Sequence, residues 1–292
     1  LKFVVRVGSW IQLPCTQAHT AMATSQVLMV TRPSPHVVEV SLNRPDKLNA
    51  YSKALCDALA DTFESLSRDV EAYVVVLRGE GKHFCCGLDL NDGAISMEGD
   101  DVARRALRVR DDIARMQRPC DLLAKLPQAT IACVHGACVG AGVDLAAACD
   151  MRYCSADAKF SIKEVDVGLA ADLGSLHRMP LVTGNMSWVR ELAFTGRQFD
   201  ASEASRFGFV SHVAVDQSSL REAVSKLASA IASKSPVALR ATKEMCCYAE
   251  GHDPDECMHY VRTLNGAMLQ TNDVMTSVQA FMTKQPATYS KL

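Results

Sequence analysis

The sequence predicts an α/β fold followed by a helical C-terminal region. Up to about residue 235, short runs rich in β-branched and apolar residues alternate with segments whose apolar residues recur at helical spacing. Such alternation is typical of an α/β core, and beyond it only helical patterns follow. With 48% hydrophobic residues among 292, the chain can bury one sizeable core. We therefore expect an extension over residues 1–27, a core over residues 28–235 and a helical region over residues 236–292.

The first unit of the core is predicted as strand, loop and helix. Residues His36–Leu42 have the β-branched content and partial alternation of a strand, which ends in the turn-forming segment Asn43–Asp46. The apolar residues of Ser52–Leu66 then recur at helical spacing. Ala72–Leu77 is a continuous apolar run of the buried-strand type, and it leads into a loop punctuated by glycines, Gly79–Gly87.

The same pattern recurs in the next part of the chain. A helix is expected over Val102–Lys125, then a buried strand over Ala129–Val134 and a short helix over Val143–Ala148. Further strands are expected over Met151–Cys154, Lys159–Ile162 and Phe209–Val215, with a loop over Glu164–Asp172. Later helices are expected over Ser175–Val182, Met186–Phe194, Leu220–Ser233, Pro236–Ala249 and Asp255–Met282, the last broken near Thr271 and Asn272.

Composition excludes several classes of function. Basic and acidic residues nearly cancel, 31 against 33, so charge alone would gather neither nucleic acid nor an anionic membrane. No run approaches the roughly 18 apolar residues that span a bilayer, so we expect no membrane insertion. The 12 cysteines are scattered without a C-x-x-C pair and are interpreted as reduced thiols that mostly fill the core. The histidines form no H-x-x-x-H pair, so we expect no metal site. Cofactor-free acid/base chemistry remains.

The segment Gly140-Ala141-Gly142 stands between a buried strand and a helix. Small residues there let the backbone approach a ligand closely, and a helix N-terminus offers N–H groups to an anion or an oxyanion. The segment is not a dinucleotide fingerprint, because Leu145 stands where the third glycine belongs. The alternative is that the small residues only permit tight packing of helix against strand.

Three carboxylates fall in apolar surroundings, where acids are costly unless they are paired or used: Asp144, Glu164 and Asp172. Burial would raise their pKa values, and a base with a raised pKa suits removal of a weakly acidic C–H proton at neutral pH. Structural alternatives stay open for each. Asp172 could cap the helix that starts at Ser175, Asp144 could complement a helix dipole, and Glu164 could pair with a nearby Lys or Arg.

Three ordered segments carry a resemblance to a known family. Asn43–Ala50, Phe84–Leu90 and His135–Leu145 resemble the landmarks of the enoyl-CoA hydratase/isomerase (crotonase) family. Ala148–Cys154 and Lys163–Asp172 extend the resemblance, and the last segment is similar to the dienoyl-CoA isomerase branch. The likeness spans about residues 28–292. It implies an α/β fold of the crotonase (ClpP-like) type, a spiral of β-β-α units whose C-terminal helices build trimers, often paired into hexamers.

The resemblance also implies a binding site for a coenzyme A thioester, in which coenzyme A is part of the substrate and no separate cofactor is needed. The backbone N–H groups of Leu88 and Ala141 would form the oxyanion hole for the thioester carbonyl. The residues expected to contact coenzyme A are Lys47, Leu48, Asn49, Ala50, Cys86, Leu88, Asp89, Leu90 and Gly140.

The acids decide which branch the chain resembles. Hydratases of the family carry a Glu where Asp144 stands and commonly lack an acid at the position of Asp172. The set of three acids is similar to the dienoyl-CoA isomerases, which implies isomerisation of 3,5-dienoyl-CoA to 2,4-dienoyl-CoA in fatty-acid β-oxidation. By this resemblance Asp172 is the base at C2, Glu164 the acid at C6, and Asp144 an electrostatic helper.

Other functions on the same fold stay open. An enoyl-CoA hydratase or a Δ3-Δ2-enoyl-CoA isomerase would use similar landmarks, because one fold hosts many chemistries. A noncatalytic scaffold that binds acyl-CoA or RNA is a more distant alternative, and the near-neutral charge and the intact acids argue against it.

The ends of the sequence carry predictions about location and assembly. Ser290-Lys291-Leu292 is the tripeptide that a peroxisomal import receptor reads, so we expect a peroxisome or a related microbody such as a glycosome. Residues 1–38 contain no acid, which is weakly typical of a transit peptide and keeps the mitochondrion as a second site. The expected assembly is a homotrimer or a homohexamer.

Overall fold

The computed structural model describes residues 26–92 and 101–292, so the extension expected over residues 1–27 lies almost wholly outside it. A six-stranded sheet has the order β1-β2-β3-β4-β6-β9, in which β1 is antiparallel to β2 and the other neighbours are parallel. Its strands are β1 (Leu28–Ser34), β2 (Val37–Leu42), β3 (Val74–Gly79), β4 (Ala129–Val134), β6 (Met151–Ser155) and β9 (His212–Ala214). A smaller sheet pairs β5 (Ala137–Val139), β7 (Lys159–Ser161) and β8 (Phe199–Asp200).

Helices follow the strands and then continue alone to the end of the chain. The helices of the core are α1 (Lys53–Ser67), α2 (Val102–Ala124), α3 (Ala141–Ala148), α4 (Ser175–Thr183), α5 (Met186–Thr195), α6 (Ala201–Arg206) and α7 (Gln217–Ala232). The last helices are α8 (Pro236–Ala249), α9 (Pro254–Met268) and α10 (Asp273–Thr283). Short 3-10 turns are η1 (Pro45–Lys47) and η2 (Glu164–Val167).

Most of the expected elements are present, and those that were missed are short or irregular. Strand β1 was not predicted, because its alternation is interrupted at Pro33, next to an irregularity in its pairing with β2. Strands β5 and β8 and helix α6 are too short to produce a period in the sequence. The segment expected as a loop over Glu164–Asp172 begins with the 3-10 turn η2.

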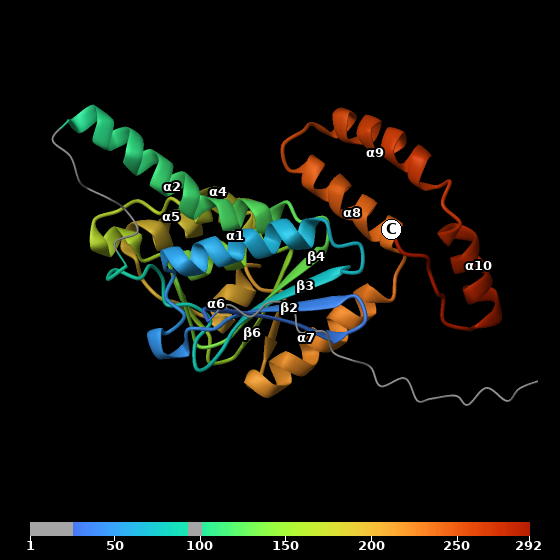
Figure 1. Ribbon diagram of the computed structural model, residues 1–292, viewed down its shortest axis with the longest axis horizontal. Coiled ribbons are helices and arrows are strands. Elements are labelled where there is room, and N and C mark those ends of the chain that lie inside the picture. Colours follow the sequence, from blue (N-terminus) through green and yellow to red (C-terminus); the bar gives the residue numbers. More distant parts are fainter. Residues whose placement is uncertain (1–25, 93–100) are drawn as a thin grey trace, which may run out of the picture.

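The main sheet lies between two apolar layers. Along the buried strand β3, Val75 and Leu77 join the layer that contains α1 and α3, whereas Val74 and Val76 join the layer that contains α7. Figure 1 shows the same arrangement, with α1 and α2 on one side of the strands and α7 on the other. Because successive side chains of a strand point to opposite faces, a strand between two layers of helices is apolar throughout.

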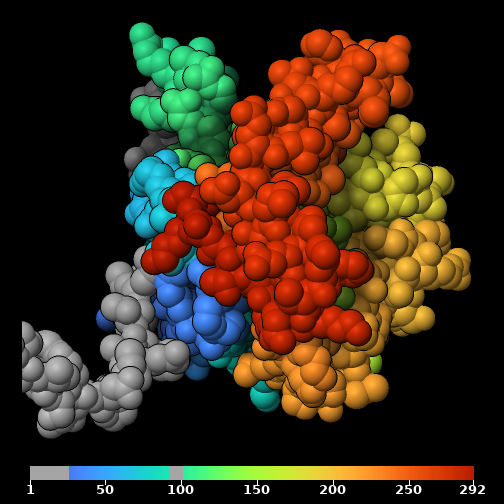
Figure 2. Space-filling model, turned by 90° about the vertical axis from the view of Figure 1, so that its right-hand side faces the viewer, coloured from blue at the N-terminus to red at the C-terminus, as the bar shows by residue number. Residues whose placement is uncertain are grey.

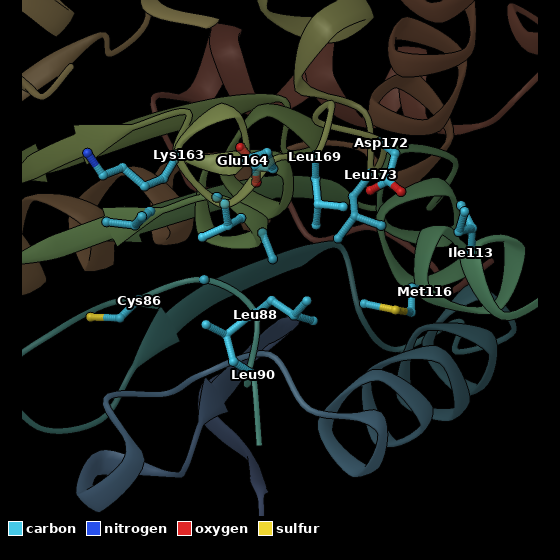
Figure 3. A pocket seen from close by; sticks show the side chains of 15 residues that line it. Cys86, Leu88, Leu90, Ile113, Met116, Lys163, Glu164, Leu169, Asp172 and Leu173 are labelled. Carbon is cyan, nitrogen blue, oxygen red and sulfur yellow. The ribbon is translucent and has the colours of Figure 1, made fainter. Parts of the chain in front are cut away.

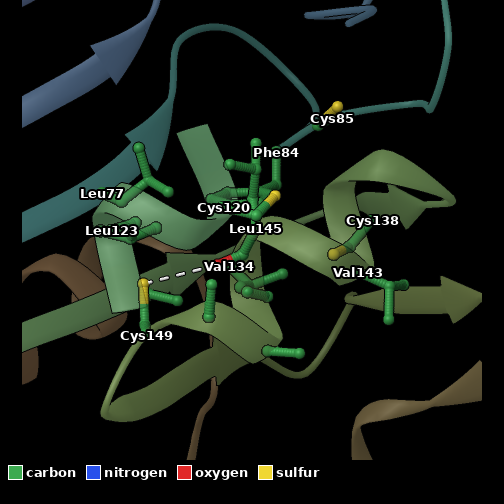
Figure 4. Close-up of a cluster of buried hydrophobic side chains, with 14 of the residues drawn as sticks. Leu77, Phe84, Cys85, Cys120, Leu123, Val134, Cys138, Val143, Leu145 and Cys149 are labelled. Carbon is green, nitrogen blue, oxygen red and sulfur yellow. Dashed lines mark hydrogen bonds between the residues drawn. The ribbon is translucent and has the colours of Figure 1, made fainter. Parts of the chain in front are cut away.

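Helix α3 passes through the centre of the larger apolar layer. All eight of its residues are buried, and Figure 4 shows Val143 and Leu145 among apolar side chains from neighbouring elements. Several cysteines fill this region, among them Cys120, Cys138 and Cys149. All eleven cysteines within the described ranges are free thiols, as the sequence predicts.

The C-terminal helices stand apart from the sheet. In Figure 1, α8, α9 and α10 extend from one end of the core, and Figure 2 shows them spread over that face of the molecule. Helix α9 has no buried residue, and the large apolar side chains of Phe281 and Met282 on α10 are 87% and 76% exposed. In the part of the chain that the structure describes, no helix combines the length and the hydropathy needed to cross a membrane.

Candidate active site

A cavity of about 200 Å³ opens between the loop after β3, helix α2 and the segment after β7 (Figure 3). Fifteen residues line it: Cys86, Gly87, Leu88, Leu90, Ile113, Met116, Val139, Gly140, Ala141, Lys163, Glu164, Val167, Leu169, Asp172 and Leu173. The lining is mainly apolar, and its two acids, Glu164 and Asp172, lie on the same side of the cavity in Figure 3.

Two backbone segments meet at one end of this cavity. Cys85 pairs with Cys138 in a parallel bridge, in which the Val139 N–H donates to the Cys85 carbonyl at 2.9 Å. Beyond the bridge the two segments stay close, since a Cβ added to Gly140 would lie 3.6 Å from the Gly87 Cα atom. The residues that follow them, Leu88 and Ala141, both line the cavity. Neither of their N–H groups donates a hydrogen bond within the described ranges of the chain. Both N–H groups are therefore available to a ligand, and available donors of this kind are what an oxyanion hole requires.

Glycines allow this close approach. A Cβ added to Gly142 would lie 2.7 Å from the Cys85 carbonyl oxygen, which is too close for any larger residue. Gly140 has a φ of +50° and caps α3. Two interpretations of Gly140-Ala141-Gly142 were open, an anion or oxyanion site and tight packing of helix against strand. They are compatible, because the packing creates the exposed N–H groups.

The carboxyl group of Glu164 lies directly over the backbone of Gly140. A Cβ on Gly140 would come within 2.7 Å of the Glu164 Oε1 atom. The other oxygen, Oε2, is buried and has no hydrogen-bond partner in the described structure. Burial raises the pKa of Glu164, and the nearby charge of Asp172 raises it further. This acid therefore stands next to the Ala141 N–H with an unused oxygen.

Pairing of Glu164 with a neighbouring base is not observed. Lys163 instead makes an ion pair with Asp166 and donates to the Gly196 carbonyl at 3.2 Å. Arg152 is buried and donates to backbone carbonyls, including that of Phe209 at 2.6 Å. Among the described residues, Glu164 has no cationic partner within ion-pair distance.

Asp172 faces the cavity and lies further from Gly140 than Glu164 does. In Figure 3, Leu169 lies between Glu164 and Asp172, so an apolar surface connects the two acids. Burial raises the pKa of the Asp172 carboxyl. Asp172 does not cap the next helix, because the N-cap residue of α4 is Gly174. That structural alternative is wrong.

Asp144 takes the capping position instead. It is 1% exposed and does not line the cavity, and its Oδ1 atom accepts the Ser175 N–H at 2.5 Å, at the start of α4. Its Oδ2 atom is buried without a partner in the described structure. Desolvation by burial raises the pKa of Asp144 to about 7, and the charge of Glu164 contributes to the increase. Asp144 also lies in the first turn of α3, as the helix-dipole interpretation expects.

The expected coenzyme A residues divide into two groups. Cys86, Leu88, Leu90 and Gly140 line the cavity. Lys47, Leu48, Asn49, Ala50 and Asp89 lie outside its lining, in the adjacent loop, where the Cys86 N–H donates to the Leu48 carbonyl at 3.1 Å.

Two residues of this loop use their side chains within the protein. The Asn49 amide is fully buried, donates to the carbonyls of Glu80 and His83 at 2.9 and 2.8 Å, and accepts the Arg44 N–H. Asp89 pairs with the Arg44 guanidinium at 2.9 Å. A ligand at this loop would therefore meet exposed backbone and the Lys47 and Leu48 side chains rather than the Asn49 amide.

Sequence reasoning missed the residues of α2 that close the cavity. Ile113 and Met116 lie on a helix that is far from the motifs in the sequence, and Met116 has the spacing of an ordinary core residue. The signal that could have found them is an apolar pair three residues apart with charged neighbours such as Asp112 and Arg115. In the described ranges no cluster of three His, Cys, Asp or Glu side chains suits a metal ion.

Comparison with known proteins places this geometry in a family. The family model described as enoyl-CoA hydratase/isomerase matches residues 33–291. The mitochondrial Δ3,5-Δ2,4-dienoyl-CoA isomerase of Rattus norvegicus is 46% identical, covering 91% of this chain and 83% of its own. The peroxisomal Δ3,5-Δ2,4-dienoyl-CoA isomerase of Arabidopsis thaliana is 40% identical, covering 88% and 93%.

Solved structures of proteins named as enoyl-CoA hydratases also superpose on this chain. An enoyl-CoA hydratase from Bacillus anthracis superposes with a TM-score of 0.83 at 30% identity, covering 90% of this chain and 99% of its own. A putative enoyl-CoA hydratase from Thermobifida fusca, solved in complex with CoA, superposes with a TM-score of 0.75 at 29% identity, covering 84% and 93%.

Proposed function

This chain belongs to the enoyl-CoA hydratase/isomerase family and isomerises 3,5-dienoyl-CoA to 2,4-dienoyl-CoA, and we propose that Glu164 and Asp172 carry the two proton transfers. The observation that supports this proposal is the placement of two carboxyl groups with raised pKa values along one apolar cavity. One of them, Glu164, lies over Gly140, which precedes the Ala141 N–H in the chain, and that N–H donates no hydrogen bond within the described ranges.

The reaction needs these parts in this arrangement. A proton leaves C2, which the thioester acidifies, and a proton arrives at C6, while the negative charge spreads over a conjugated dienolate. The N–H groups of Leu88 and Ala141 would hold the enolate oxygen, and loss of one such donor typically costs about 3 kcal/mol of transition-state stabilisation. Acids with raised pKa values suit both transfers, because one must accept and the other donate near neutral pH.

The position of the oxyanion hole favours Glu164 as the base at C2. C2 is bonded to the thioester carbonyl carbon, whereas C6 lies four bonds further along the acyl chain. Glu164 lies over Gly140, which precedes Ala141 in the chain, and Asp172 lies further from Gly140. This geometry favours the reverse of the assignment implied by the resemblance, in which Asp172 acts at C2 and Glu164 at C6. The two assignments predict opposite outcomes for exchange of the C2 hydrogen with solvent.

The protons balance over one turnover. Glu164 enters ionised and leaves with the C2 proton, and Asp172 enters protonated and leaves ionised after donating to C6. A proton then returns from Glu164 to Asp172 through solvent. Asp144 takes no part in either transfer, because it does not line the cavity, and it acts through its charge near Glu164 and its hydrogen bond to Ser175.

An activity comparison tests this function. Purified protein, without added metal or nucleotide, should convert 3,5-dienoyl-CoA to the conjugated 2,4-isomer, which raises near-ultraviolet absorbance. The same protein should be compared on 2-enoyl-CoA and 3-enoyl-CoA. Hydration of 2-enoyl-CoA that is faster than the dienoyl isomerisation would identify a hydratase, and rapid conversion of 3-enoyl-CoA alone would identify a Δ3-Δ2 isomerase.

The protein binds acyl-CoA, and we propose that the thioester end occupies the cavity lined by Cys86, Leu88, Leu90 and Gly140. The exposed backbone of the adjacent loop, from Lys47 to Ala50, would contact the nucleotide part of coenzyme A. We propose that no further cofactor takes part, since the acids and N–H groups account for every proton and charge in the reaction.

The C-terminal helices support a proposal about assembly. The exposed apolar side chains of α9, its C-cap and α10 include Met258, Leu269, Met275, Phe281 and Met282. Such a surface is costly in water and is typical of an interface between subunits. We propose a homotrimer or a homohexamer, with a mass about three or six times 31.7 kDa in light scattering. A monomer would contradict this proposal.

The known relatives work in the peroxisome and in the mitochondrion, and both compartments are supported for this chain. We propose the peroxisome or a related microbody, because Ser290-Lys291-Leu292 suits a peroxisomal import receptor. Deletion of the tripeptide should leave activity intact and keep the protein in the cytosol. Unchanged organelle import would instead indicate a signal near the N-terminus.

A further inference from the structure

The loop that carries Asp172 is tied to helix α2 by side chains outside the reacting set. The Gln117 Nε2 atom donates to the Asp172 carbonyl oxygen at 2.6 Å. One residue further along the loop, the Leu173 carbonyl accepts from Arg178 at 3.2 Å, and Arg178 pairs with Asp121 on α2 at 2.6 Å. Two points of α2 are therefore joined to two consecutive carbonyls of this loop.

Helix α2 is itself anchored at the same turn. The buried Tyr51 hydroxyl donates to the Met116 carbonyl at 2.9 Å, and the Met116 side chain lines the cavity. Gln117 is the next residue, and it points to the loop rather than to α1, which Arg118 contacts through its ion pair with Glu64. The turn of α2 that forms one wall of the cavity thus also holds the backbone of Asp172.

We propose that Gln117 is a positioning residue for Asp172, an inference that rests on the proposed role of Asp172 in proton transfer. Gln117 does not line the cavity, so it acts through the Asp172 backbone rather than on the substrate. Without this hydrogen bond, the carboxyl group of Asp172 shifts relative to an acyl chain that the oxyanion hole fixes at its other end. A misplacement of about 1 Å can slow a reaction about 10²-fold.

The effect is confined to one of the two protons. Glu164 belongs to the 3-10 turn η2, whose backbone is fixed by hydrogen bonds of its own, such as that from the Leu169 N–H to the Glu164 carbonyl at 3.0 Å. None of these bonds involves Gln117. Loss of the Gln117 contact therefore leaves the base, the oxyanion donors and the binding of coenzyme A in place, and it changes only the proton that Asp172 handles.

The test compares Gln117→Met, which keeps the side-chain length and loses the donor, with Arg118→Met, a matched change at the next residue that faces α1. Gln117→Met should lower kcat for isomerisation at least 10-fold with little change in KM, and thermal unfolding should show that it is folded. Arg118→Met should keep kcat within about 2-fold of wild type. Wild-type kcat in a folded Gln117→Met protein would overturn the proposal.

A second variant adds a pH readout that a merely structural role would not produce. In Gln117→Glu, the ionised carboxylate repels the Asp172 carbonyl, whereas the protonated carboxyl can donate to it. Its kcat relative to wild type should therefore rise as pH falls. A ratio that does not change with pH would argue against a hydrogen bond to this carbonyl.

Exchange of the C2 hydrogen with deuterated solvent separates this proposal from the function on which it rests. Gln117→Met should affect the same proton as Asp172→Asn does. If both variants keep C2 exchange, the positioning role and the assignment of Asp172 to C6 both stand. If both lose it, Gln117 still positions Asp172 and the assignment of the protons is reversed. If Asp172→Asn keeps C2 exchange and Gln117→Met loses it, the positioning role is wrong.

Discussion

The polar groups on the two sides of the cavity differ in their hydrogen-bond partners and in the direction of their pKa shifts. On one side, which we call the bonded loop (residues 44–50 and 84–90), the Asn49 amide and the Asp89 carboxylate have partners, and the pKa of Asp89 is lowered by its hydrogen bond to Arg44. On the other side is the group that we call the acid wall, in which Glu164 and Asp172 line the cavity and Asp144 is buried outside the lining. All three pKa values of the acid wall are raised, mainly by desolvation.

The difference separates residues that hold the fold from a group of acids that contains the two proposed to react. A buried polar group is stabilising only when its hydrogen bonds are made, and an unpaired one costs about 1–3 kcal/mol. Glu164 and Asp144 each keep one buried oxygen without a partner in the described structure. The acid wall therefore lowers the free energy of unfolding, and substitutions there should reduce activity more than stability. Substitutions of the hydrogen-bonded side chains in the bonded loop should reduce stability more than activity.

The largest expected effect is on activity, at the acid wall. Glu164→Gln and Asp172→Asn should each lower the isomerisation rate about 10²- to 10⁴-fold, the usual contribution of a general acid or base. If Glu164 is the base at C2, only Glu164→Gln should also lose C2 exchange with deuterated solvent. Because each change preserves volume and places no charge in the apolar cavity, neither should lower the thermal unfolding temperature.

Mass spectrometry of recovered substrate measures the exchange, and the wild-type protein in the same solvent is its reference. Loss of C2 exchange in folded Asp172→Asn, together with its survival in folded Glu164→Gln, would show that the assignment implied by the resemblance is the correct one.

The next effect is on stability, in the bonded loop. Asn49→Ala should lower the free energy of unfolding by about 3 kcal/mol, because it strands two carbonyls and the Arg44 N–H that the amide now satisfies. Asn49 also has a φ of +54°, a conformation that Asn tolerates better than Ala. Denaturant titration measures this change.

A matched control is Asn43→Ala, since the only side-chain bond of Asn43 in the described structure is exposed and 3.4 Å long. That variant should stay within about 0.5 kcal/mol of wild type. Equal losses in the two variants would mean that the buried amide is no more important than an exposed one.

The contrast between the two sides was only partly visible in the sequence. Two of the acids could be found because carboxylates are rare in apolar segments such as Gly142–Ala146 and Leu169–Leu173, and Glu164 because it lies between apolar residues close by. The motif around Asn49 could be found too, but its sequence gave no sign that the amide bonds inward to residues more than 30 positions away. Sequence spacing indicates which residues are special, and tertiary contacts decide whether their side chains face a ligand or the protein.

The same limit explains the other differences. The parallel sheet and most helices follow from periodicity, whereas the cavity wall formed by Ile113 and Met116 arises from packing of α2 against distant segments. The tie between Gln117 and the loop of Asp172 joins residues 55 positions apart, and no local pattern encodes it. Short elements such as β5 are formed by pairing with other strands rather than by their own propensity.

A smaller effect, which depends on pH, is expected at Asp144. Its pKa is about 7 in the folded protein and near 3.8 in a model peptide, so the folded state holds the proton more strongly. Its contribution to stability is therefore greatest below about pH 4 and is lost as pH rises through 7. Asp144→Asn removes this loss but leaves a buried amide that is partly unpaired, so it should gain about 2 kcal/mol of stability at pH 8.

The comparison needs only the difference between Asp144→Asn and wild type at each pH, since other titrating groups cancel. The amide oxygen can still accept the Ser175 N–H, so the cap of α4 is preserved. The gain should vanish near pH 4. A gain that is the same at pH 4 and pH 8 would mean that the carboxyl is not titrating in this range.

The smallest effect is expected where the bonded loop ends in an ion pair. Asp89 has a lowered pKa because Arg44 donates to it, so its contribution to stability is present above pH 4 and is lost as pH falls below the ordinary Asp value of 3.8. The pair is partly buried, with side chains 16% and 13% exposed, but an Asn at this position can still accept the Arg44 hydrogen bond, so the substitution removes the charge and not the bond. Asp89→Asn should therefore cost less than 1 kcal/mol at pH 7 in denaturant titration, and Asp46→Asn, an exposed acid of the same loop, should cost still less. The cost should shrink at pH 3 and at high salt, because protonation and screening both weaken the pair.

If Asp89 is also a coenzyme A contact, its substitution should raise KM without lowering kcat, since nucleotide binding is the same in the ground and transition states. A loss above 3 kcal/mol in the free energy of unfolding would place Asp89 with Asn49 as a residue on which the fold depends. A fall in kcat at unchanged stability would mean that the bonded loop takes part in the chemistry. The contrast between the two sides would then not hold.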